Sequence, residues 1–79
     1  YPNPFNPSTT IRYNLSVGGH VKLIVYDLKG KEVTQLVSRH QLAGDYEVEW
    51  NATGLSSGIY FCRFQTGDFT ASRQMILLK

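Results

Sequence analysis

Apolar and polar residues alternate along most of this chain with a period of two. This period is typical of a half-buried β-strand, in which successive side chains point to opposite faces of a sheet. We therefore predict strands over residues 8–15, 20–26 and 45–51. Their inward faces would carry Ile11, Tyr13 and Leu15; Val21, Leu23 and Val25; and Tyr46, Val48 and Trp50.

A turn signal predicts a hairpin in the middle of the chain. Asp27-Leu28-Lys29-Gly30 has Asp at the first position of a turn and Gly where a positive φ costs little, so we expect it to join strands 21–26 and 31–37. The largely polar residues 38–44 would then form the connection that crosses between sheets. A helix over 33–41 is the alternative, because its apolar residues have near-helical spacing, but its β-branched residues favour a strand.

The last third of the chain predicts a central strand and a closing strand. Residues 59–65 are mostly aromatic or β-branched and follow a turn rich in Ser and Gly. A second turn signal precedes the closing strand at 69–78. Tyr60, two residues after Gly58, has the spacing of a tyrosine corner, whose hydroxyl bonds to the upstream backbone while the ring stays in the core.

These elements together predict an all-β fold, an immunoglobulin-like antiparallel β-sandwich of six or seven short strands. A chain of 79 residues holds a single domain. All three prolines fall within Tyr1–Pro7, where they remove backbone donors and favour extended geometry. Residues 1–7 are therefore expected to be the end of a Pro-rich linker, and residues 8–79 the domain.

Composition excludes several classes of partner. The net charge of +2, from 8 Lys and Arg against 6 Asp and Glu, is too small and too dispersed for nucleic-acid binding. The longest apolar run, Met75 to Leu78, is far shorter than the roughly 20 residues that span a bilayer, so we predict no transmembrane segment. No basic and apolar leader begins at Tyr1, so any export signal would lie upstream in a longer parent chain.

No group of residues predicts catalysis. His20, on a strand edge, and His40, in a loop, lack further ligands at metal-binding spacing, so both are expected to be surface histidines. Cys62 alternates inward with its neighbours and is expected to be buried and inert. The carboxylates fall at separate turns or on one exposed strand face, so no acid and base pair is expected to converge. We therefore predict that the chain is not an enzyme and holds no cofactor or metal.

Aromatic side chains suggest one other role, because exposed rings on a small β-module form a sugar-binding platform. Five rings fall on predicted inward faces: Tyr13, Tyr46, Trp50, Tyr60 and Phe64. Core packing is favoured for them, since a small domain needs its large rings inside. Phe61, Tyr26 and Phe69 remain for such a platform.

Four blocks of the sequence together resemble a known family. They are Tyr1-Pro2-Asn3-Pro4-Phe5-Asn6-Pro7-Ser8-Thr9-Thr10-Ile11; Val21-x-Leu23-x-Val25-Tyr26-Asp27-x-x-Gly30-x-x-Val33; Leu55-x-x-Gly58-x-Tyr60; and Ser72-Arg73-Gln74-Met75-Ile76-Leu77-Leu78-Lys79. In this order, and over essentially the whole chain, they are similar to the type A C-terminal sorting domain of type IX secretion. That family lies at the C-termini of proteins exported by Bacteroidetes and related bacteria.

The resemblance implies a function in protein export. A domain of this family guides a folded passenger, which precedes it in the parent chain, through the outer-membrane translocon. Translocon, shuttle and sortase proteins would be its partners, and the sortase usually removes the domain. The passenger would cross the periplasm and end at the cell surface or outside the cell.

The resemblance also assigns roles by position. Pro2, Asn3 and Pro4 match the leading motif of the family, and Gly58 and Tyr60 its middle motif. Sorting and recognition would concentrate on the last strand, at Arg73, Met75, Ile76, Leu77, Leu78 and Lys79. Cys62 departs from the apolar or aromatic residue that is expected at its position.

A function of a different class stays open beside this one. Similar short sandwiches occur as accessory or carbohydrate-binding modules of large extracellular enzymes, which would not need a free C-terminal strand. The middle motif alone does not separate the two. The Pro-rich beginning of the chain and the terminal Leu77-Leu78-Lys79 favour the sorting domain.

Overall fold

The computed structural model describes residues 8–78. Its strands are β1 (Ser8–Leu15), β2 (Gly19–Asp27), β3 (Glu32–Gln41), β4 (Gly44–Asn51), β5 (Gly58–Thr66) and β6 (Phe69–Leu77). All neighbouring strands pair antiparallel, and the described residues contain no helix. The predicted all-β class is confirmed.

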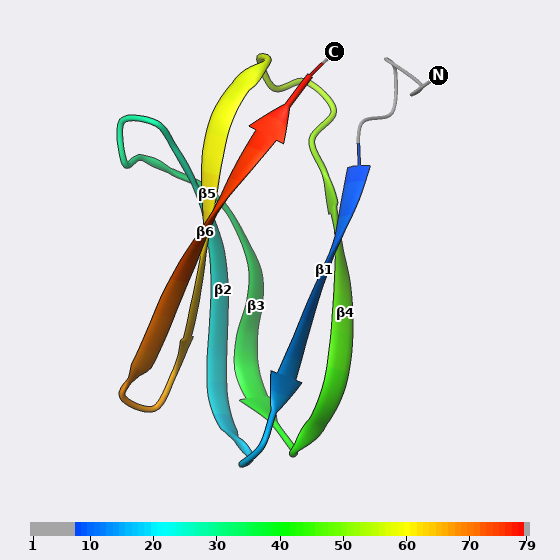
Figure 1. The fold of residues 1–79 in the computed structure, drawn as a ribbon, viewed down its shortest axis with the longest axis vertical. Helices are drawn as coiled ribbons and strands as arrows, with labels where there is room; N and C mark the ends of the chain where they lie inside the picture. The colour runs from blue at the N-terminus through cyan, green and yellow to red at the C-terminus, as the bar shows by residue number, and fades with distance from the viewer. Residues whose placement is uncertain (1–7, 79) are drawn as a thin grey trace.

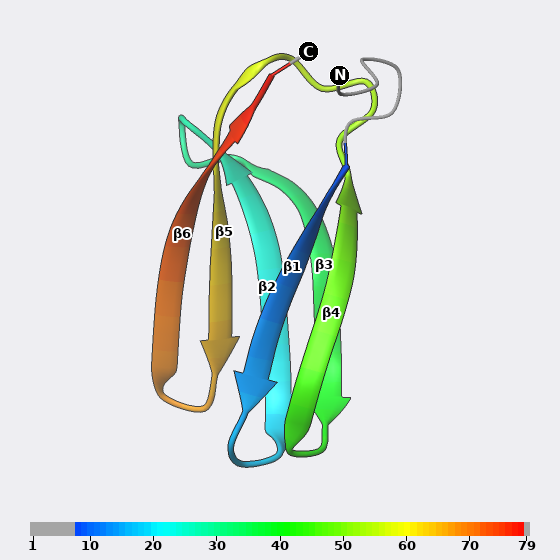
Figure 2. The same cartoon turned by 45° about the vertical axis from the view of Figure 1, so that its right-hand side comes forward.

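The strands form two layers (Figure 1). β1 and β4 make a two-stranded sheet, and the other four strands make a sheet in the order β3-β2-β5-β6. Figure 2 shows the small sheet in front of the large one, with the chain changing sheet after β1, β3 and β4. This arrangement is compatible with the immunoglobulin-like sandwich that the sequence predicts.

The core lies between the layers and follows the predicted alternation. Val21, Leu23 and Val25 of β2, a central strand of the large sheet, are at most 1% exposed. Leu15 and Trp50 of the small sheet are buried with them. The alternation therefore identifies the inward face of each of these strands correctly.

Aromatic rings fill the space under the small sheet. Tyr13 of β1 stacks on Tyr46 of β4, with ring centroids 5.4 Å apart, and lies 5.1 Å from the ring of Phe64 in the opposite layer. Trp50 and Tyr60 meet edge to face across the layers at 5.5 Å. These large rings let two strands cover much of a four-stranded sheet, as their predicted inward placement requires.

Strand β3 is longer than predicted. It continues to Gln41, so the expected connection over 38–44 is wrong, and Leu42 and Ala43 alone link β3 to β4. Polar residues form a strand here because β3 is an edge of the large sheet, where many side chains face solvent. Gln41 points inward and accepts a hydrogen bond of 2.6 Å from the hydroxyl of Tyr13.

Two register shifts explain the near-helical spacing of apolar residues in β3. Leu36 and Val33 are each an additional residue without a Cα partner on β2. Such bulges disturb the strict alternation of faces, which lets Leu36 pack against the core beside Val37. The helix considered for residues 33–41 is therefore excluded.

Asp27 holds the turn between β2 and β3, as the sequence predicts. Its Oδ1 accepts hydrogen bonds of 2.9 Å from the backbone N–H groups of Lys29 and Lys31. Gly30 has a φ of 86° and donates its N–H to the carbonyl of Asp27. Glycine adopts this φ without the steric cost of a Cβ atom.

Two tyrosines make the same contact where the chain crosses between sheets. The hydroxyl of Tyr60 donates to the carbonyl of Ser56 at 2.7 Å, which is the predicted tyrosine corner. Tyr46 donates in the same way, at 2.6 Å, to the carbonyl four residues upstream. Each tyrosine lies two residues after a glycine of positive φ, Gly44 at 150° and Gly58 at 156°. The Gly-x-Tyr spacing at Tyr46 was the signal for this second corner, which sequence reasoning missed.

We expect Tyr60→Phe to lower the free energy of unfolding by about 0.5 to 1.5 kcal/mol, because the ring stays packed while its hydrogen bond is lost. Tyr46→Phe should cost less, since Tyr46 is only half-buried and water can replace its hydroxyl. Urea denaturation of both variants measures the difference. An unchanged midpoint for Tyr60→Phe would contradict a stabilising role for the corner.

Candidate functional site

β6, which carries most of the predicted recognition residues, is an edge strand of the large sheet (Figure 1). It pairs with β5 along its whole length, from Leu77 opposite Gly58 to Phe69 opposite Thr66. None of the described strands pairs with its other side. The backbone N–H and C=O groups of that side are therefore open to a further strand.

The apolar run at the end of β6 divides between two faces. Leu77 is 8% exposed and Met75 is half-buried against the core, whereas Ile76 and Leu78 are 65% and 76% exposed. We call Ile76 and Leu78 the outer pair. Ile76 lies opposite Ile59 of β5, which enlarges the apolar surface on this face. The strand is thus anchored by one set of aliphatic side chains and presents the other set to solvent.

Arg73 lies on the inward face of β6, opposite Cys62 of β5, but its side chain is exposed at the side of the sandwich. Among residues 8–78, the ion pair that forms joins Arg12 Nε to Glu47 Oε2 at 2.9 Å, and Arg73 takes part in none. An inward-pointing charge on an edge strand disfavours edge-to-edge association of like chains. Within the described part of the chain, Arg73 therefore combines a cation that forms no ion pair with an open strand edge.

Cys62 is 5% exposed, which confirms its predicted burial. Burial raises the pKa of the thiol, and the nearby Arg73 guanidinium acts in the opposite direction with a smaller effect. The thiol therefore stays protonated at neutral pH, and the thiolate is the reactive form of cysteine.

The register of β5 and β6 brings two sequence motifs together. Gly58 lies opposite Leu77 and Tyr60 opposite Met75, so the middle motif and the last strand are neighbours in space. Ser56, which holds the Tyr60 hydroxyl, precedes the same end of β5. The predicted site residues Pro2, Asn3, Pro4 and Lys79 lie outside the described residues.

Both histidines lie on the surface, as the sequence predicts. His20 and His40 are exposed and lie opposite one another on β2 and β3, so the expectation that His40 lies in a loop is wrong, because β3 extends to Gln41. Within residues 8–78, no group of three or more His, Cys, Asp or Glu could hold a metal ion. Nor does this part of the chain contain a helix long and apolar enough to cross a membrane.

A groove between β1 and β6 is the main feature that sequence reasoning missed. It has a volume of about 290 Å³ and is lined by residues of four strands, Arg73 and Met75 among them. The alternation pattern identifies the inward face of a strand but does not say which strands are neighbours. No sequence signal marks the groove, because its two walls are far apart along the chain.

The chain matches a known protein family. A family model described as the secretion system C-terminal sorting domain matches residues 1–78. No curated protein and no solved structure matches the chain. The family match covers nearly the whole sequence, including both the residues before β1 and the strand β6.

We expect the Cys62 thiol to resist a maleimide reagent in the folded chain and to react after denaturation, because burial blocks access and disfavours the thiolate. Mass spectrometry of the labelled protein measures the rate in each state. Labelling of the folded chain at the rate of the unfolded chain would contradict the inward placement of Cys62.

The raised pKa of Cys62 also predicts how stability depends on pH. The folded state holds the thiol proton more tightly than the unfolded state, so this contribution to stability is present at neutral pH and is lost as pH rises through the ordinary thiol range. The free energy of unfolding should therefore fall more steeply between about pH 7 and pH 9.5 in the wild type than in Cys62→Ala. Equal slopes in urea denaturation series would show that Cys62 titrates alike in both states.

Proposed function

Because the chain belongs to the secretion system C-terminal sorting domains, we propose that it directs a passenger protein through the type IX outer-membrane translocon and is then removed by a surface sortase. Membership of the family implies a passenger in the parent chain, a secretion machinery that accepts it, and export to the cell surface or the extracellular space. In the proposal, the passenger crosses the periplasm and a shuttle protein assists its delivery.

The observation that carries the proposal is the family match over residues 1–78, and the placement of β6 supports it. A receptor of the translocon needs a feature that an ordinary folded passenger does not display. β6 offers a free strand edge together with the exposed outer pair Ile76 and Leu78. Edge pairing and adjacent apolar side chains are the two contributions to β-strand addition.

Truncation would be an ambiguous test of this role. Removing residues 75–79 deletes Leu77, which is buried beside Tyr60 in the core. Loss of such a side chain costs about 2 to 5 kcal/mol, so a truncated domain is expected to unfold as well as to lose its signal. Substitution of the exposed outer pair separates recognition from stability.

We expect the double variant Ile76→Thr and Leu78→Thr to reduce surface delivery of a folded reporter about tenfold or more, with its stability unchanged within about 0.5 kcal/mol. Thr keeps a strand-forming shape at the edge while removing most of the aliphatic surface. Cell fractionation of a type IX-competent host measures delivery, and urea denaturation of the isolated chain measures stability.

A matched control replaces Leu28 and Leu42 with Thr, since these residues are 66% and 74% exposed and lie in turns outside β6. This variant should be delivered like the wild type. Equal delivery of all three proteins would reject recognition through the outer pair. Equal loss in both variants would point to a general effect of surface composition instead.

A further inference from the structure

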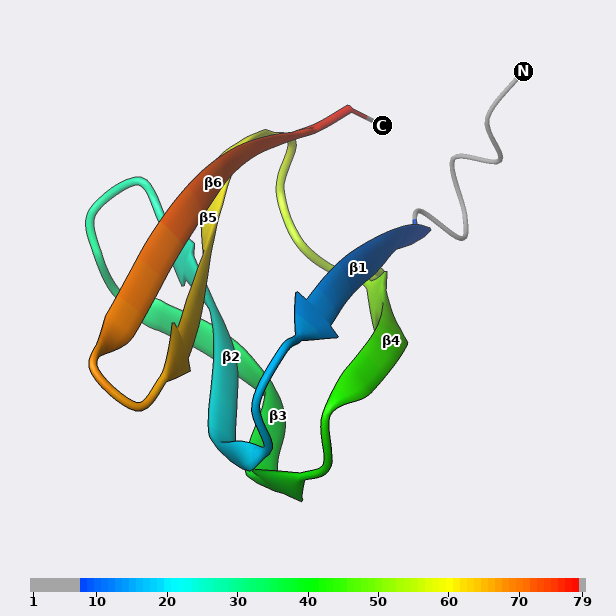
Figure 3. The same cartoon turned by 60° about the horizontal axis from the view of Figure 1, so that its bottom comes forward.

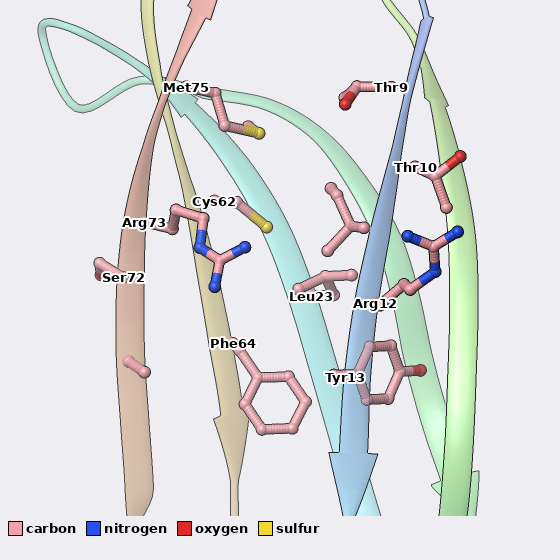
Figure 4. A pocket seen from close by; sticks show the side chains of 12 residues that line it. Thr9, Thr10, Arg12, Tyr13, Leu23, Cys62, Phe64, Ser72, Arg73 and Met75 are labelled. Atoms are coloured by element: carbon pink, nitrogen blue, oxygen red, sulfur yellow. The ribbon is translucent and has the colours of Figure 1, made fainter.

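The groove between β1 and β6 opens on the side of the sandwich away from the link between β3 and β4. Figure 3 shows β1 and β6 together on this side, where no strand joins the two sheets. Leu23, Cys62 and Phe64 of the large sheet form its floor (Figure 4). Leu23 and Cys62 are 1% and 5% exposed, so they lie deep in the floor, and the half-buried Phe64 is its accessible part. The groove above has a volume of about 290 Å³.

Both walls of the groove are free strand edges. Consecutive residues line it on each side, 9–13 of β1 and 71–73 of β6. Successive side chains of a strand point to opposite faces, so an unbroken run means that the backbone edge itself borders the groove. Among the described strands, β1 pairs with β4 alone and β6 with β5 alone. An extended segment lying in the groove would find unpaired backbone groups beside it.

The groove also holds a positive charge, Arg73, that has no ion-pair partner among residues 8–78. Figure 4 shows the guanidinium of Arg73 turned from β6 toward the space between the sheets. Arg12, on the opposite wall, already donates to Glu47 at 2.9 Å, whereas Arg73 forms no ion pair within residues 8–78. Arginine pairs with a carboxylate through two parallel hydrogen bonds. Charge complementarity therefore favours an occupant that bears a carboxylate.

The side chains of the terminal segments of this chain do not supply that group. Residues 1–7, 8–15 and 69–78 contain neither Asp nor Glu. A second copy that inserted its own β1 or β6 would bring another arginine, Arg12 or Arg73, into the groove. Like charges at close range are unfavourable, so these occupants are selected against.

We propose that this groove binds an extended segment of a different protein, which hydrogen-bonds to the free edge of β6 and sets an Asp or Glu carboxylate against Arg73. The same segment places aliphatic side chains at alternate positions over the half-buried Phe64 and Met75. The proposal rests on the proposed function only in making the partner a component of the export machinery. The chemistry of the bound segment follows from the groove itself.

The test uses two synthetic peptides with the 9 residues of β6 as their length. Both alternate Val with Thr, and one carries Glu where the other carries Gln at an inward position. Both peptides are acetylated and amidated, so that neither terminus supplies a charge. Isothermal titration measures their affinity for the 79-residue chain, and backbone amide shifts in NMR spectra locate the binding site.

The Glu peptide should bind about five- to tenfold more tightly than the Gln peptide, as a charge-assisted pair predicts. Arg73→Gln should abolish this preference. Arg63→Gln is the matched control, because Arg63 is also exposed but bonds to the Tyr26 hydroxyl on the outer face of β5, and it should keep the preference. The shifted amides should lie in residues 9–13 and 70–75.

Several results would overturn the proposal. These are absence of binding by both peptides, a preference that survives Arg73→Gln, or amide shifts centred on the outer pair. The chain could instead sediment as a dimer, with the NMR signals of the groove amides shifting only when the dimer dissociates. That result would assign the groove to a second copy. Groove amides that change when residues 1–7 are deleted would assign it to that segment. A chain that binds neither peptide but delivers its reporter normally would remove the groove proposal and leave the proposed function intact.

Discussion

Two strands must cover four in this sandwich, and much of the structure follows from that constraint. The small sheet of β1 and β4 spans the large sheet only because it carries large rings on its inner face, with Tyr13 stacked on Tyr46 and Trp50 packed against Tyr60. Even so, the small sheet leaves most of β6 uncovered. The uncovered side of the large sheet becomes the groove, and the unequal layers leave the edges of β1 and β6 free beside it.

The chain changes sheet three times, and at two of these crossings a tyrosine hydroxyl fixes the backbone by a hydrogen bond. Tyr46 and Tyr60 each return a hydroxyl to the carbonyl four residues upstream, immediately after the chain has crossed to the other layer. The ring of each tyrosine packs on the core while its hydroxyl fixes the path of the backbone. In β5 this corner also sets the residues that pair with β6, so the middle motif determines where the last strand lies.

Strict alternation made most strands predictable from the sequence, and its interruption explains the failures. β1 from Ile11 onward and β4 alternate without interruption, so their inward residues and their bounds were foreseen to within a residue. The full length of β3 was not foreseen. The extra residues Leu36 and Val33 interrupt its alternation, and its C-terminal half is polar because the strand lies at a sheet edge. The groove and the opposition of Arg73 to Cys62 depend on which strands are neighbours, and periodicity within one strand carries no such information.

The beginning of β1 and the end of β6 lie at the same end of the sandwich (Figure 1). A force applied between these two points would act across the strands rather than along them. Hydrogen bonds loaded in this direction open one after another from the loaded end, whereas bonds loaded along the strands resist together. The β-sandwich would therefore offer little mechanical resistance to a machine that holds β6 and draws on whatever precedes Ser8.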